Sequence, residues 1–131
     1  MISKIRYEEI GQIIVQASYE VHKELGPGLL ESVYEVCLEE EIKRLKLRVE
    51  RQVKLPVVFK GKTLGKDFII DLLVENEVII ELKAVEILLP VHEVQLVTYL
   101  KLADKKLGFL INFNVPLIKQ GIKRKVNQYY F

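Results

Sequence analysis

The first part of the chain has the hydrophobic periodicity of two amphipathic helices. Between residues 7 and 25, apolar side chains recur at intervals of three and four positions, which places them on one face of a helix. These residues are Ile10, Ile14, Ala17, Val21 and Leu25. The sequence Gly26-Pro27-Gly28 predicts the end of this helix. A second helix is predicted over residues 29–46, and its inward-facing stripe comprises Tyr34, Leu38, Ile42 and Leu45.

After residue 48 the pattern changes to the alternation that is typical of strands. Apolar residues of a first strand alternate with charged residues and proline, at Val49, Val53, Leu55, Val57 and Phe59. Turn residues at 61–62 and 75–77 separate this strand from a second strand over 64–74 and a third over 78–84. Pro90 predicts the start of a helix that continues to residue 103. Two further strands are expected at 107–113 and 118–126.

This order of elements, ααβββαββ, predicts an α/β fold with a mixed central sheet flanked by helices. The crossover through helix 90–103 returns the chain to the sheet, so we expect the strand that follows it to pair in parallel with a neighbour. At 131 residues, the chain is long enough for one domain and short for two. A single domain over residues 1–131 is therefore predicted.

Composition narrows the class of protein. Hydrophobic residues make up 50% and charged residues 29% of the chain, which is typical of a soluble globular protein and excludes a disordered one. No segment approaches the roughly 20 apolar residues of a membrane span, and no N-terminal signal is visible. We expect a cytoplasmic protein without membrane contact. The single cysteine, Cys37, excludes an internal disulfide and a multi-cysteine metal site.

The predicted strand at 78–84 combines an apolar, buried character with two charged side chains. Glu81 and Lys83 are two positions apart, so both side chains leave the same face of the strand. Burial of charge is unfavourable unless the charge is paired or bound to a metal. The two side chains could pair with each other, and this strand alone does not exclude that structural role.

A second acid, Asp71, lies within the apolar run of the preceding strand. With a three-residue turn between the strands, Val74 pairs with Val78, and Asp71 lies opposite Glu81. Two carboxylates that face each other across neighbouring strands repel, and a divalent cation between them reverses the sign of that interaction. A two-residue turn would instead pair Asp71 with Leu82 and place the acids on opposite faces. The metal interpretation therefore predicts the register of this hairpin.

These residues resemble a known motif. Asp71 and, ten positions later, Glu81-Leu82-Lys83 are similar to the D…ExK core of the PD-(D/E)xK nuclease superfamily. The segment Gly28-Leu-Leu-Glu31-Ser-Val-Tyr34 matches G-x-x-E-x-x-Y, the signature of the GxxExxY family of PD-(D/E)xK-like proteins. The resemblance extends over residues 7–126. The proline that precedes the aspartate in the superfamily motif is absent, because Ile70 occupies that position.

The resemblance implies a restriction-endonuclease-like core with a divalent-metal site. By this resemblance Asp71 and Glu81 hold Mg²⁺ or Mn²⁺, hard cations that favour oxygen ligands, and the carbonyl of Leu82 is a further ligand. Lys83 orients the attacking water or stabilises the charge of the transition state. Glu31 completes the metal site directly or through water. The alternative for Glu31 is a helix-capping charge, since anions are favoured near a helix N-terminus.

Three polar residues of helix 90–103 share one face, because they are spaced three and four positions apart: His92, Gln95 and Tyr99. The resemblance implies that Gln95 and Tyr99 contact the site or the substrate phosphate. The alternative is the polar rim of an amphipathic helix. A lone histidine near a helix start, such as His92, is more typical of a cap or a packing residue.

Two classes of function fit these residues. The first is a metal-dependent nuclease that hydrolyses phosphodiester bonds, with DNA as the favoured substrate; a homodimer is compatible with it. The second is a catalytically silent module that keeps the nuclease fold and binds nucleic acid or a protein. The net charge of +2 does not by itself indicate a nucleic-acid binder. Lys and Arg cluster at 119–125, either as a solvated edge or as a phosphate contact.

Overall fold

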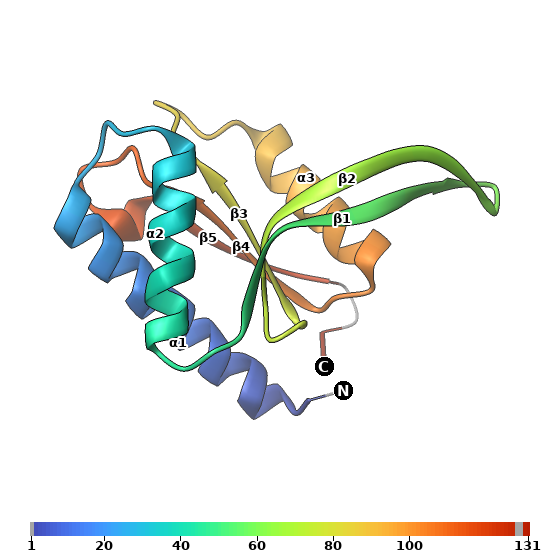
Figure 1. The fold of residues 1–131 in the computed structure, drawn as a ribbon, viewed down its shortest axis with the longest axis horizontal. Helices are drawn as coiled ribbons and strands as arrows, with labels where there is room; N and C mark the ends of the chain where they lie inside the picture. The colour runs from blue at the N-terminus through green and yellow to red at the C-terminus, as the bar shows by residue number, and fades with distance from the viewer. Residues whose placement is uncertain (1, 128–129) are drawn as a thin grey trace.

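The computed structural model describes residues 2–127 and 130–131, and it contains helices and strands in the predicted order (Figure 1). The helices are α1 (Lys4–Leu25), α2 (Glu31–Arg44) and α3 (Pro90–Ala103). The strands are β1 (Val49–Phe59), β2 (Lys62–Val74), β3 (Val78–Lys83), β4 (Leu107–Asn112) and β5 (Ile122–Val126). A short 3-10 helix, η1 (Ile118–Gln120), precedes β5.

The last predicted strand, 118–126, is wrong in its first part. The residues of η1 form a helical turn there, and β5 begins only at Ile122. Gly121 lies between them, and its carbonyl accepts a hydrogen bond from the Asn112 N–H at 2.9 Å. A Cβ on Gly121 would lie 2.0 Å from the Asn112 carbonyl oxygen, so only glycine allows this close approach. The chain therefore has to turn against the end of β4 before β5 can pair with it.

The five strands form one mixed sheet in the order β1-β2-β3-β4-β5. β1, β2 and β3 form an antiparallel meander, and β5 is antiparallel to β4. β3 and β4 are parallel, as the crossover through α3 predicts. Val74 pairs with Val78, so the predicted three-residue turn and its register are confirmed. Glu75 and Asn76 close that turn with left-handed backbone, at φ of 53° and 55°.

Helices cover both faces of the sheet (Figure 1). α1 and α2 pack on one face through the larger apolar cluster, and α3 packs on the other face through a smaller one. Gly108 allows α3 to approach β4 closely, because a Cβ there would lie 2.9 Å from Leu96 Cδ1 and 3.2 Å from the Ile79 carbonyl oxygen. β4 is buried along its whole length, and β3 is buried except at Lys83. The two central strands thus form the middle layer of an α/β sandwich.

Tyr34 fixes the connection between α1 and α2. Its hydroxyl donates a hydrogen bond to the Gly26 carbonyl at 2.6 Å. Its ring is fully buried and stacks on Phe113, with ring centroids 4.6 Å apart. Gly28, at φ of 95°, supplies a backbone conformation that favours glycine. The G-x-x-E-x-x-Y segment is therefore also a structural unit, which fixes the N-terminus of α2 and with it Glu31.

β1 and β2 continue beyond the rest of the sheet as a two-stranded ribbon (Figure 1). β3 pairs with β2 only from Leu72 to Val74, so the longer outer part of β2 pairs with β1 alone. α3 supports the inner part of this ribbon, where the Phe68 and Tyr99 ring centroids are 5.4 Å apart. The ribbon ends in a turn at Lys60 and Gly61, both with left-handed backbone. None of the described helices is long and apolar enough to cross a bilayer.

Candidate active site

Asp71 and Glu81 lie at the point where β2 separates from β3. The last backbone pair between these strands is Leu72 with Ile80, and the two acids are the next residues outward. Oδ2 of Asp71 accepts a hydrogen bond from the Leu82 N–H at 2.8 Å. The Asp71 carboxylate therefore takes the place of the next backbone hydrogen-bond acceptor and links β2 to β3 at this point.

Glu81 is a buried carboxyl group with an acidic neighbour. The residue is 7% exposed, and its Oε1 atom has no hydrogen-bond partner in the part of the chain that the structure describes. Burial raises the pKa of Glu81 to about 9, and the negative charge of Asp71 adds to that increase. The Lys83 ammonium opposes it only in part. Without a cation, Glu81 is therefore protonated at neutral pH.

Glu31 lies within electrostatic reach of Asp71, and Lys83 lies within reach of both Glu31 and Glu81. Glu31 is the first residue of α2 and is exposed overall, yet partial burial of its carboxyl and then the charge of Asp71 raise its pKa. Lys83, half-buried at the end of β3, acts in the opposite direction on that pKa. The residue that caps α2 is Leu30, without a side-chain hydrogen bond. Glu31 is therefore within electrostatic reach of Asp71 and makes no capping bond.

Of the three polar residues predicted to share a face of α3, Tyr99 is the one that reaches the acids. Tyr99 is 8% exposed, and burial, followed by the charges of the two carboxylates, raises its pKa. Gln95, one turn earlier, is exposed. His92 lies in the first turn, where its Nδ1 is 3.1 Å from the Leu89 nitrogen and accepts the N–H, so it caps the helix. The three residues therefore have different environments, although their spacing places them on one face of the helix.

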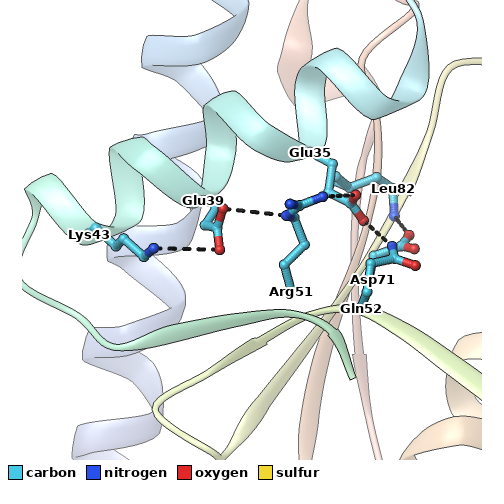
Figure 2. A network of polar contacts seen from close by, with 7 residues as sticks. All are labelled: Glu35, Glu39, Lys43, Arg51, Gln52, Asp71 and Leu82. Carbon is cyan, nitrogen blue, oxygen red and sulfur yellow. Dashed lines mark hydrogen bonds and ion pairs between the residues drawn. The ribbon is translucent and has the colours of Figure 1, made fainter. Parts of the chain in front are cut away.

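Glu35 is a buried acid of α2 that was not among the predicted site residues. Its Oε1 accepts a hydrogen bond from Gln52 Nε2 at 2.6 Å, and its Oε2 lies 3.6 Å from the Arg51 guanidinium (Figure 2). Burial is the largest cause of its raised pKa, and the charge of Asp71 contributes. Glu35 follows Glu31 by four positions, so both lie on one helix face. That spacing is the sequence signal that identifies Glu35.

β1 is distorted at Gln52, opposite Asp71. Gln52 has a φ of 56°, in the left-handed region that residues other than glycine seldom adopt. The residues on either side of Gln52 pair regularly with β2, so the distortion is local. The hydrogen bond to Glu35 stabilises this conformation, and the polar network continues along α2 to Glu39 and Lys43 (Figure 2). No pattern in the sequence predicts a left-handed glutamine at this position.

The donor set at the site suits a hard divalent cation that is held by two carboxylates. No three His, Cys, Asp or Glu side chains within residues 2–127 and 130–131 are grouped to hold a metal. Mg²⁺ does not require three, because it is commonly bound through one or two carboxylates and completes its shell with water and substrate phosphates. The adjacent Asp71 and Glu81, with the unpartnered Oε1 of Glu81, fit such an ion.

The basic cluster at 119–125 lies on β5 and the turn before it, two strands from β3, and Lys123 is in register with Glu81 through Leu110. Arg124 is paired with Glu8 at 2.6 Å, and Lys125 is paired with Glu93 at 2.6 Å. These pairs neutralise two of its charges within the protein itself. For Arg124 and Lys125 these pairs favour the solvated-edge interpretation over the phosphate-contact interpretation.

A comparison with known families agrees with this arrangement. The family model described as the PD-(D/E)XK nuclease superfamily matches residues 8–125, which include Asp71, Glu81 and Lys83. No curated protein and no solved structure matches the chain. The match covers nearly the whole chain and all of the mixed sheet except Val126, the last residue of β5. The chain therefore belongs to the PD-(D/E)XK nuclease superfamily.

Proposed function

We propose that this protein is a metal-dependent nuclease that hydrolyses phosphodiester bonds in DNA, with Mg²⁺ or Mn²⁺ as its cofactor. The observation that supports this most directly is the buried Glu81 carboxyl, which lies beside Asp71 with one oxygen atom unpartnered. Membership of the superfamily supports a nucleic-acid substrate. Within the superfamily we propose the GxxExxY family, on the match of residues 28–34 to its signature.

In this proposal Asp71 and Glu81 hold the cation through carboxylate oxygens, and the Leu82 carbonyl is a further ligand. When bound, the cation polarises the scissile phosphate and lowers the pKa of an attacking water. Glu81 gives up its proton to become a ligand, because a positive charge then compensates its buried negative charge. Glu31, exposed beside Asp71, contacts the metal site through water.

The other residues of the proposed site act on the substrate. Lys83, at the end of the strand that carries Glu81, orients the water or stabilises the charge that develops on the phosphate. The Tyr99 hydroxyl can donate a hydrogen bond to a phosphate oxygen. Gln95 is exposed one turn away on α3 and contacts the nucleic-acid backbone.

Mn²⁺ titration and cleavage of labelled DNA test this proposal together. We expect wild type to bind Mn²⁺ calorimetrically and to cut at least one of a set of single-stranded, duplex, linear and circular DNAs. Asp71→Asn keeps the shape of the side chain but removes its charge, so it should lose both properties. Asp67→Asn, the same change at an exposed position of β2, is the matched control for metal binding. A wild-type protein that neither binds Mn²⁺ nor cuts any of these DNAs contradicts the proposal.

A catalytically silent binding module is the second candidate function. The observation that favours it is the small donor set, since no third acidic, cysteine or histidine ligand joins the two carboxylates among the described residues. Such a module would bind nucleic acid or a protein without cleavage. Its melting temperature should not depend on Mn²⁺, whereas a ligand present at 100 times its Kd stabilises the folded state by about 2.7 kcal/mol.

A further inference from the structure

The outer part of the β1–β2 hairpin, residues 54–67, is an exposed ribbon that we call the arm. Its two sides pair with each other from Pro56 with Asp67 to Phe59 with Lys62, and with no other strand. Figure 1 shows the arm extending past α3, away from both helical layers. The β1 side of the arm, from Lys54 to Phe59, is six residues long, which corresponds to about 20 Å. The arm is therefore long enough to contact a binding partner.

The arm has a local excess of positive charge. Four lysines and one aspartate give residues 54–67 a net charge of +3, whereas the whole chain has +2, so the remainder has −1. None of these four lysines forms an ion pair in the described part of the chain, in contrast to Arg124 and Lys125 on β5. The lysines are Lys54, Lys60, Lys62 and Lys66. Such a concentration of free charge suits a polyanion.

Apolar side chains at the tip of the arm accompany the lysines. Val58 is 58%, Phe59 is 62% and Leu64 is 49% exposed. The Lys60 ammonium lies 5.6 Å from the Phe59 ring centroid, so a cation and an aromatic surface are presented together. A nucleic acid offers both counterparts, because phosphates attract the lysines and base edges or thymine methyl groups accept apolar contacts.

We propose that the arm enters the major groove of duplex DNA and holds the substrate against the acidic site. This inference rests on the proposed nuclease function and identifies its substrate as double-stranded. The major groove is about 12 Å wide and admits a two-stranded β-ribbon. The same strand that forms one side of the arm continues from Asp67 to Asp71, a distance of about 13 Å along the strand. DNA held by the arm therefore lies next to the site without a separate recognition domain.

Binding of a labelled duplex, measured by fluorescence anisotropy in EDTA over a range of salt concentrations, tests the arm without cleavage. Two variants lose the same charge from exposed lysines, and Lys60 is kept in both because its left-handed backbone shapes the turn. The arm variant carries Lys54→Gln, Lys62→Gln and Lys66→Gln. The control variant carries Lys4→Gln, Lys23→Gln and Lys119→Gln.

We expect the arm variant to flatten the plot of log affinity against log salt by about 0.9 for each phosphate that it no longer neutralises, up to about 2.7. At 0.1 M salt this corresponds to an affinity loss of at least about tenfold and at most about 500-fold. The control variant should keep the wild-type slope. Equal slopes in the two variants, whether both unchanged or both reduced, overturn the inference and leave the nuclease proposal standing.

Two further measurements separate a groove-binding arm from other uses of the ribbon. Duplex RNA of the same sequence should bind more weakly than duplex DNA, because the A-form major groove is too deep and narrow for a ribbon to reach the bases. Phe59→Ser should weaken binding to duplex DNA and leave the sedimentation behaviour unchanged. Equal affinity for both duplexes, or a Phe59→Ser protein that changes its oligomeric state and binds DNA normally, overturns the inference. If the wild-type protein binds duplex DNA through the arm but cleaves no DNA, the nuclease proposal is overturned and the inference about the arm stands.

Discussion

The two ends of β2 lie in opposite environments. Residues 70–74 are buried or half-buried, and most of them pair with strands on both sides. Residues 62–67 are exposed and pair only with β1. Asp71 lies in the buried end, whereas the exposed end carries Lys62 and Lys66.

The difference shows how one strand can serve two kinds of chemistry. A carboxylate in the protein interior is unfavourable unless a cation or hydrogen bonds compensate it, so the buried end suits a metal ligand. An exposed lysine needs no partner, so the outer end retains free charge for a polyanion. We expect substitutions near Asp71 and Glu81 to change the chemical step and the stability of the fold. Substitutions in the arm should change only the binding of DNA.

The largest effect is expected at Lys83. Lys83→Ala should lower kcat by about 10²- to 10³-fold, because a protonated lysine acts on the transition state rather than as a metal ligand. Its Mn²⁺ affinity, measured by calorimetry, should be retained or increased. Lys66→Ala in the arm is the contrast, with an expected rise in KM and an unchanged kcat at saturating DNA. If Lys83→Ala cuts DNA at the wild-type rate, the role proposed for Lys83 in the mechanism is wrong, even if the fold is correct.

The next effect concerns the stability of the metal-free protein as a function of pH. Burial raises the pKa of Glu81 from 4.5 to about 9, so the folded state holds a proton that the unfolded chain has released in this range. The free energy of unfolding should therefore fall as pH rises from 5 to 9, by at most about 1.4 kcal/mol per pH unit. Glu81→Gln should remove this slope, and exposed Glu50→Gln should not. Denaturant unfolding at several pH values measures this pH dependence. If the free energy of unfolding changes with pH in the same way for wild type and Glu81→Gln, the prediction is contradicted.

Two acids of α2 provide a smaller and sharper contrast. Glu35→Ala should lower the free energy of unfolding by about 1–3 kcal/mol, because it leaves Gln52 and Arg51 without their buried partner. Glu31→Ala, four positions earlier at an exposed site, should change it by less than about 0.5 kcal/mol. Urea unfolding without metal measures both. Equal losses would mean that the network around Gln52 does not stabilise the fold.

The smallest effect is expected at the tip of the arm. Phe59→Ser should change the free energy of unfolding by no more than about 0.5 kcal/mol, because the ring is mostly exposed. Leu110→Ala in β4, fully buried, should cost about 2–5 kcal/mol and serves as the reference. A thermal melt of each variant is sufficient. A large destabilisation by Phe59→Ser would show that the arm packs against the folded body.

Much of the fold could be predicted because its signals are local. Pro90 sets the start of α3, and Asp104 ends it in left-handed backbone, so the predicted bounds of this helix are those observed. The three-residue turn after Val74 sets the hairpin register that places Asp71 near Glu81. Asp71, Glu81 and Lys83 are identifiable as charged side chains on apolar strands; their metal and catalytic roles come from the resemblance and stay predictions.

The remainder depends on contacts that a local pattern does not contain. The bond between Glu35 and Gln52 joins α2 to β1 and accompanies a left-handed residue without any turn motif. The exposed arm could not be predicted from the sequence for a different reason. The alternation at Val53, Leu55, Val57 and Phe59 predicts a strand with one covered face, but α3 covers only its inner part. Periodicity identifies a strand, and the neighbouring elements decide how far along it burial extends.

The two hairpin turns of the meander should differ in the changes of length that they tolerate over evolution. An insertion at Lys60 and Gly61 would lengthen the ribbon and leave the positions of Asp71 and Glu81 unchanged. One residue more or fewer between Val74 and Val78 would move the paired side chains of β2 to opposite faces and separate the two acids. Related chains that retain the nuclease chemistry should therefore vary in length at the outer turn and keep the inner turn at a fixed length.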